Sequence, residues 1–87
     1  MNVFCGPYRL FKKSESARGA FESVISLCVL DDHSVSERFY QNGNLSKTDV
    51  NKNTSLASAI DSMIARLESL TNKEGYKTVD VLDKFAL

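Results

Sequence analysis

Few residues in this chain have the types and spacing that enzyme chemistry requires. Its one histidine, His33, lies beside Asp31 and Asp32 in the polar stretch DDHS. Nucleophilic catalysis needs a Ser, Cys or Lys side chain, a base that activates it, and a third group that orients the base. Because a short polar turn supplies no such set, we expect no catalytic residues and no enzyme activity. Catalysis would require an unexpected convergence of His33 with one of the two aspartates.

The sequence also lacks the patterns of metal and cofactor sites. Zinc sites repeat cysteine and histidine at short intervals, and calcium loops alternate acidic side chains before a glycine. Neither pattern occurs here, and neither does a phosphate-binding loop of the GxxxxGK[ST] or GxGxxG type. We therefore expect no metal ion and no cofactor, and we interpret the DDHS stretch as a solvated turn.

Two cysteines, Cys5 and Cys28, each lie among apolar residues. Secreted domains of this size are usually dense in cysteine, so we expect two thiols that pack as small hydrophobic groups rather than a disulfide. The N-terminal residues do not have the order of a secretory signal, and no apolar run approaches the roughly 18 residues of a membrane span. We expect a cytoplasmic protein without a membrane partner.

The segment RFYQNGN, residues 38–44, is the strongest candidate for a binding site. Neighbouring residues of a strand point to opposite faces, so Tyr40 shares a face with Arg38 if Phe39 lies in the core. An exposed aromatic ring beside a guanidinium is suited to stacking or to a protein hot spot. A cross-strand aromatic pair without a ligand is the alternative. From this segment and its surroundings, the candidate binding residues are Arg38, Tyr40, Gln41 and Lys47.

Charge adds a second set of candidates. The eleven basic and eleven acidic residues cancel, but residues 1–20 carry four Lys/Arg against one Glu, whereas residues 21–44 carry four Asp/Glu against one Arg. A dedicated duplex binder usually shows an overall basic excess. The local basic patch could contact phosphate or an acidic protein surface, or could simply be solubilising charge. Its members are Arg9, Lys12, Lys13 and Arg18.

Hydrophobic periodicity predicts the elements that position these residues. Alternation favours strands at 2–13, 20–30 and 35–41, with Gly6-Pro7 marking an edge strand or a bent entry. Asn42-Gly43 predicts a type I′ hairpin turn. Residues 45–50 have the polar character of an exposed edge strand, which could pair with a second copy of the chain. Residues 14–19 are interpreted as a loop.

From Asn53 onward the apolar period changes to that of a helix of roughly 18 residues. Asn53, Thr54 or Ser55 can cap its start, and Gly75 lies just past its end. Arg66 and Glu68 are interpreted as solvated positions of this helix, and residues 78–83 as a last short strand with Tyr76 as its anchor. The apolar stripe is formed by Leu56, Ile60, Met63, Ile64, Leu67 and Leu70.

This order of elements predicts an α+β fold in a single domain, residues 1–87. We expect a small antiparallel β-sheet of three to five strands with one long α-helix packed on one face. The other face of the sheet would then be open to a partner.

Residues 21–76 resemble a degenerate WGR domain, the small sheet-plus-helix module of some poly(ADP-ribose) polymerases and of stand-alone bacterial proteins. FESVISLCVLDDHSVSERFYQNGNLSKT stands where the family has its strands and its Trp-Gly-Arg, and TSLASAIDSMIARLESLTNKEGYK resembles its helix and closing Gly-Tyr. Phe39, Tyr40 and Gln41 occupy the tripeptide, so the family's arginine is not kept. The resemblance implies contact with nucleic acid or with neighbouring domains.

We therefore expect a small non-catalytic binding protein that acts through a macromolecular surface, in the first place that of another protein. Small accessory proteins of phages and mobile elements, including inhibitors of host enzymes, have this build. The alternative is a nucleic-acid-binding WGR-like module that uses the basic residues named above and Arg38 and Lys47.

Overall fold

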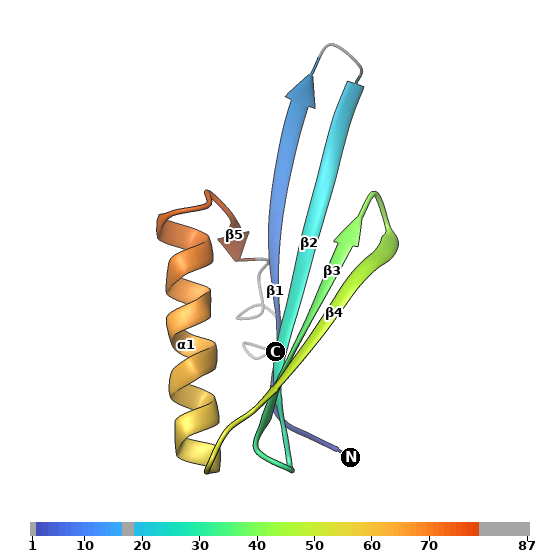
Figure 1. Ribbon diagram of the computed structural model, residues 1–87. Coiled ribbons are helices and arrows are strands. Elements are labelled where there is room, and N and C mark those ends of the chain that lie inside the picture. The colour runs from blue at the N-terminus through green and yellow to red at the C-terminus, as the bar shows by residue number, and fades with distance from the viewer. Residues whose placement is uncertain (1, 17–18, 79–87) are drawn as a thin grey trace, which may run out of the picture.

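The computed structural model describes residues 2–16 and 19–78. It confirms the α+β fold, in which an antiparallel sheet is covered on one face by a single helix (Figure 1). In chain order, the elements are β1 (Val3–Ser16), β2 (Gly19–Leu30), β3 (Ser34–Gln41), β4 (Asn44–Lys52), α1 (Leu56–Asn72) and β5 (Lys77–Thr78).

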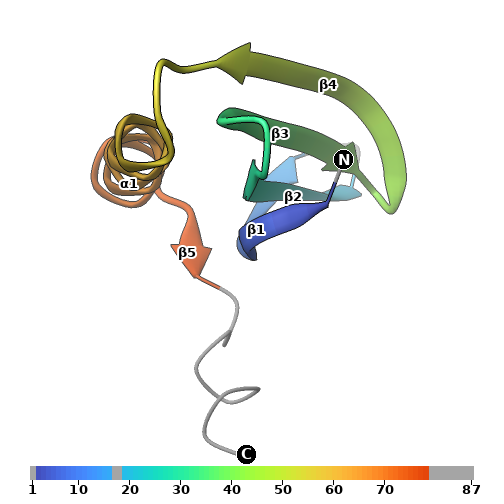
Figure 2. The same cartoon turned by 90° about the horizontal axis from the view of Figure 1, so that it is seen from below.

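The strands follow one another across the sheet in the order β4-β3-β2-β1-β5, and every pairing is antiparallel. The predicted turn between β3 and β4 is present, with φ of 50° at Asn42 and 84° at Gly43. Positive φ at both central positions is what a type I′ hairpin requires. Seen end-on, α1 lies to one side of the curved sheet, and β4 forms its outer border (Figure 2).

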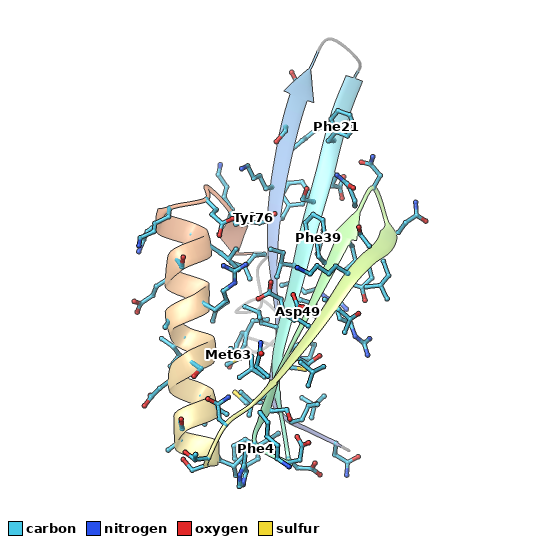
Figure 3. All side chains as sticks on the ribbon, in the orientation of Figure 1. Phe4, Phe21, Phe39, Asp49, Met63 and Tyr76 are labelled. Atoms are coloured by element: carbon cyan, nitrogen blue, oxygen red, sulfur yellow. The ribbon has the colours of Figure 1, made fainter. Side chains whose placement is uncertain are left out.

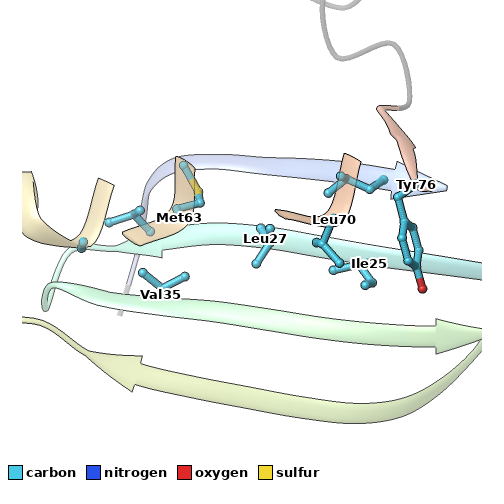
Figure 4. Close-up of a cluster of buried hydrophobic side chains, with 9 residues drawn as sticks. Ile25, Leu27, Val35, Met63, Leu70 and Tyr76 are labelled. Carbon is cyan, nitrogen blue, oxygen red and sulfur yellow. The ribbon is translucent and has the colours of Figure 1, made fainter. Parts of the chain in front are cut away.

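β2 is the central strand because its odd-numbered residues are apolar throughout the part that α1 covers. Ile25, Leu27 and Val29 are at most 4 % exposed. The register places Leu10 of β1 and Phe39 of β3 on either side of Ile25. These side chains pack against the apolar stripe of α1 in one core cluster (Figure 4).

The prediction of a loop at residues 14–19 is wrong. β1 and β2 remain paired as far as Ser16 and Gly19, and together they form a two-stranded arm. β3 pairs with β2 only from Ser23 onward, so the end of the arm projects beyond the rest of the sheet (Figure 1). Both faces of such an arm meet water, so its strands carry no apolar alternation that a sequence reading could detect.

The predicted irregularity at Gly6-Pro7 is present in β1. The register between β1 and β2 shifts between Cys5 and Tyr8, and the Gly6-Pro7 peptide bond is cis. Gly6 has φ of 99°, and a Cβ at this position would lie 2.9 Å from the backbone oxygen of Leu27. Only glycine allows the two strands to approach this closely.

α1 begins and ends as its sequence predicts. The Ser55 hydroxyl accepts a hydrogen bond from the Ser58 backbone N–H at 3.1 Å, which caps the first turn. After the helix, Gly75 has φ of 75°, and the Tyr76 N–H donates to the Leu70 carbonyl at 3.0 Å. This reversal returns the chain to the sheet, where Tyr76 is buried and β5 pairs with β1. Val79 to Asp83 of the predicted last strand lie outside the described residues.

Two neighbouring residues of α1 test this packing. Met63 is 2 % exposed and contacts the sheet, whereas Ile64 is 44 % exposed. We expect Met63→Ala to lower the free energy of unfolding by about 2–5 kcal/mol, because it removes buried apolar area and leaves a cavity. Ile64→Ala should change it by less than about 1 kcal/mol. Urea denaturation of both variants measures the difference, and equal losses would contradict the assigned helix face.

Candidate functional site

The face of the sheet opposite α1 is the candidate site, and we call it the reverse face. Its residues alternate with those that face the helix, as the strand registers show. Arg38 and Tyr40 both belong to it, while Phe39 between them packs against the core. The middle of the reverse face is formed by Arg9, Phe11, Val24, Ser26, Cys28, Ser36, Arg38, Tyr40, Leu45, Thr48 and Val50.

An apolar row crosses four strands of the reverse face. Phe11 lies opposite Val24, Val24 opposite Tyr40, and Tyr40 opposite Leu45. The first three side chains are half-buried against one another, whereas Leu45 is 54 % exposed. On the same face of β4, Val50 is 56 % exposed. The row is thus a real apolar surface in the described structure, not a covered core.

A row of arginines lies directly beside this apolar row. Arg9 and Arg38 stand on either side of Ser26, on β1 and β3, and both are exposed. Among residues 2–16 and 19–78, neither arginine forms an ion pair. A guanidinium without an internal partner can donate up to five hydrogen bonds to an external carboxylate or phosphate.

The structure separates the other candidate residues. Lys13 shares the reverse face but lies opposite Glu22 in the arm. Lys12 lies on the helix side, with its Nζ 5.6 Å from the centre of the Tyr76 ring. Lys47 is opposite Phe39 on the helix side, and Gln41 is exposed at the end of β3. Arg18 lies outside the described residues. The eight candidates therefore do not form one surface.

The two cysteines lie on opposite faces of the sheet, and both are free thiols. Cys5 is on the helix side, with its Sγ 3.3 Å from the Tyr8 hydroxyl. Cys28 is on the reverse face, where burial raises the pKa of its thiol. The positive charge of Arg38 and a hydrogen bond with Ser36 oppose that rise in pKa. A disulfide between the two residues is thus ruled out by the strand alternation.

On the helix side, Arg66 forms an ion-pair cluster with two glutamates. Its Nε and Nη2 atoms donate to both carboxylate oxygens of Glu37 at 2.9 and 3.2 Å, and its Nη1 donates to Glu74 at 3.2 Å. The hydrogen bonds with Glu37 are the main reason that the pKa of Arg66 is raised. The Arg66 side chain is 40 % exposed, so it is partly solvated as expected, but it also connects α1 to β3, which the sequence did not predict.

Two hollows of about 340 and 310 Å³ adjoin this cluster, between α1 and the β3–β4 pair. Glu37, Asp49 and Arg66 line both hollows, and Figure 3 shows Asp49 on the side of β4 that faces the helix. Apart from Lys52, the charged groups in them already pair within the chain, since Arg66 binds Glu37 and Glu74 and Lys47 lies 3.5 Å from Asp49. We therefore assign no ligand to these hollows.

The DDHS stretch is a turn between β2 and β3. The Asp32 carboxylate accepts a hydrogen bond from the Ser34 N–H at 3.1 Å, and hydrogen bonding with Ser34 lowers the pKa of Asp32. His33 has φ of 72°. In the part of the chain that the structure describes, no group of three His, Cys, Asp or Glu side chains could hold a metal ion.

Comparison of the chain with protein-family models, with curated proteins and with solved structures found no match. The resemblance to a WGR domain therefore stays a prediction. No helix within the described ranges is long and apolar enough to cross a membrane.

The two ion pairs of Arg66, with Glu37 and with Glu74, should differ in strength. The Glu37 side chain is 19 % exposed and that of Glu74 47 %. We expect Glu37→Gln to lower the free energy of unfolding by about 1 kcal/mol, because a bidentate and partly desolvated pair is lost. Glu74→Gln should cost less than about 0.5 kcal/mol. Chemical denaturation in low and high salt measures both losses in the free energy of unfolding. A larger loss in Glu74→Gln than in Glu37→Gln would contradict the prediction.

The proximity of Arg38 to Cys28 can be measured by thiol alkylation in a Cys5→Ser background. Because burial raises the pKa of Cys28, its alkylation should be slower than that of a free thiol and should accelerate as the pH rises toward that pKa. Arg38→Gln removes a charge that lowers the pKa, so we expect roughly two- to threefold slower alkylation near pH 8. Arg38→Lys serves as the control and should keep the rate. A rate unchanged by Arg38→Gln would contradict the geometry.

Proposed function

We propose that this chain is a small non-catalytic binding protein that uses its reverse face to cover a surface of another protein. The observation that carries the proposal is the apolar row of Phe11, Val24, Tyr40 and Leu45 beside two arginines that pair with no acidic side chain of the described part of the chain. Aromatic and arginine side chains are the residue types that contribute most to protein interfaces.

The charge of the reverse face supports a partner with acidic groups. Its basic side chains are Arg9, Lys13, Arg38, Lys52 and Lys77, and its acidic side chains are Glu15 and Glu22, which both lie in the arm. The middle of the face is therefore positive, although the chain as a whole is neutral. Carboxylates that surround an apolar anchor on the partner would match this arrangement. An inhibitor or accessory protein of phage or mobile-element type would act in this way, by occupying the partner's surface.

Nucleic-acid binding by a WGR-like module is the second candidate. Arg9 and Arg38, which flank Ser26 on the same face as Tyr40, could contact phosphates while Tyr40 stacks on a base. Two observations favour a protein partner instead. Leu45 and Val50 expose aliphatic surface in the same area, and Lys12 and Lys47 point to the other face of the sheet. A nucleic acid bound to the reverse face would gain little from the aliphatic side chains of Leu45 and Val50, and it would not reach Lys12 and Lys47.

Affinity capture from a lysate of the source organism tests the proposal with matched variants. We expect the wild-type chain to retain one protein in stoichiometric amount, before and after nuclease treatment. Tyr40→Ala and Arg38→Ala should each reduce its recovery by about tenfold, as hot-spot truncations do. Glu68→Ala, an exposed change on the outer side of α1, is the control and should not reduce it.

The native cysteines provide a second readout in the same experiment. A bound partner should protect Cys28 from alkylation and leave Cys5 unaffected, because the two thiols lie on opposite faces. Capture of no stoichiometric protein would contradict the proposal. Loss of the captured material on nuclease treatment, with a mobility shift at about 50 mM salt, would favour the nucleic-acid candidate.

A further inference from the structure

The outer edge of β4 is a second surface that the chain leaves open. β4 is the terminal strand of the sheet, and within the described residues no other strand pairs with its outer edge. Eight of its nine residues are exposed. Figures 1 and 2 show this strand at the outer border of the sheet, at the opposite end from β5, with only its C-terminal end next to α1. A long edge of this kind is a template for pairing with another strand.

One hydrogen bond shows which backbone groups of β4 point away from β3 and can bind another strand. The Asn53 N–H donates to the His33 carbonyl at 2.9 Å, so Asn53 directs its backbone groups toward β3. In an antiparallel ladder every second residue does the same, and no register shift occurs between Asn53 and Lys47. The N–H and C=O groups of Thr48 and Val50 therefore point outward.

Charges along β4 are complementary to those of a second copy in one register. Lys47 and Asp49 flank Thr48 and share a face. If two copies pair antiparallel around a two-fold axis at Thr48, each Lys47 lies opposite the Asp49 of the other copy. An axis at Asp49 or at Lys47 would instead place like charges opposite each other, which is unfavourable.

We propose that two copies of this chain associate through their β4 strands, antiparallel and centred on Thr48. Thr48 is the middle residue of Asn44–Lys52, and the register shift at Ser46 confines regular pairing to the residues around Thr48. Lysines on edge strands usually prevent such pairing, because they face apolar or like-charged groups. Here each lysine has a carboxylate opposite it. The outward groups of the two Thr48 residues form the central hydrogen-bonded pair.

This dimer has a defined shape. The two-fold axis is perpendicular to the sheet, so both helices lie on one side and both reverse faces on the other. The interface contains one strand from each copy, which is small by the standard of stable dimers, so we expect weak and concentration-dependent association. The proposal does not rest on the proposed function, because the outer edge of β4 remains open whether or not the reverse face binds a partner.

Charge reversal tests the pairing. Sedimentation velocity of the full chain, from about 1 µM to about 1 mM, should show a reversible monomer–dimer equilibrium. Lys47→Asp and Asp49→Lys should each weaken the dimer by about tenfold or more, because each variant replaces two attractive pairs with two repulsive pairs. The double variant Lys47→Asp/Asp49→Lys restores opposite charges and should recover the dimer. Circular dichroism of each variant verifies that the monomer is folded.

Disulfide trapping tests the register in a Cys5→Ser/Cys28→Ser background. Thr48→Cys should form a covalent dimer on mild oxidation, since paired residues lie about 5.5 Å apart between Cα atoms. Val50→Cys is the control. In this register the two Val50 residues are separated by four positions, or about 13 Å, which a disulfide cannot span.

Each outcome decides the proposal. A monomer at every concentration, or a dimer that does not respond to the single charge reversals, would overturn pairing through β4. Covalent dimers of Val50→Cys but not of Thr48→Cys would overturn the register. If the double variant is folded but does not regain the dimer that the single variants lose, the Lys47–Asp49 charges do not select the partner strand.

Discussion

The packing of one stripe of α1 against the odd-numbered residues of β2 is the contact on which the rest of the structure depends. Because Ile25, Leu27 and Val29 must all face the helix, the even-numbered residues of β2 must face away. Pairing transmits this alternation to β1 and β3. The position of Arg38 and Tyr40 on the reverse face is therefore a consequence of the core, since a slip of one residue would bury the guanidinium and expose Phe39.

A single helix also limits how much of the sheet can be apolar. A helix is about 10 Å wide and strands are about 4.8 Å apart, so α1 covers two to three strands. Its contacts are mainly with β2 and β3. β4 lies beyond this cover, and its helix-side residues are accordingly polar or charged. Arg66 lies at the boundary, where its methylene groups can cover the edge of the core while its guanidinium binds Glu37.

Sequence reasoning succeeded where apolar periodicity or a special backbone conformation marks an element. The helix, the central strand and the Asn42-Gly43 turn belong to this class. It failed for the β1–β2 arm, which has two solvated faces, and it missed the ion pair between Arg66 and Glu37, because the two residues are 29 positions apart in sequence. The candidate binding residues lie on both faces of the sheet, because charge counted along the chain does not distinguish the two faces of a strand. Alternation within β1 could have separated Arg9 and Lys13 from Lys12.

The extra residue in β4 determines which charges reach the reverse face. Tyr40 pairs with Leu45 and Phe39 with Lys47, so Ser46 is bulged out of the ladder. Without this bulge, regular pairing from the Asn42-Gly43 turn would place Lys47 opposite Arg38, two like charges in direct contact. The bulge moves Lys47 to the helix side beside Asp49 and places Thr48 opposite Arg38. One inserted residue thus leaves the arginine row without an internal neighbour of either sign on β4, and at the same time creates the Lys-Thr-Asp pattern on the open edge.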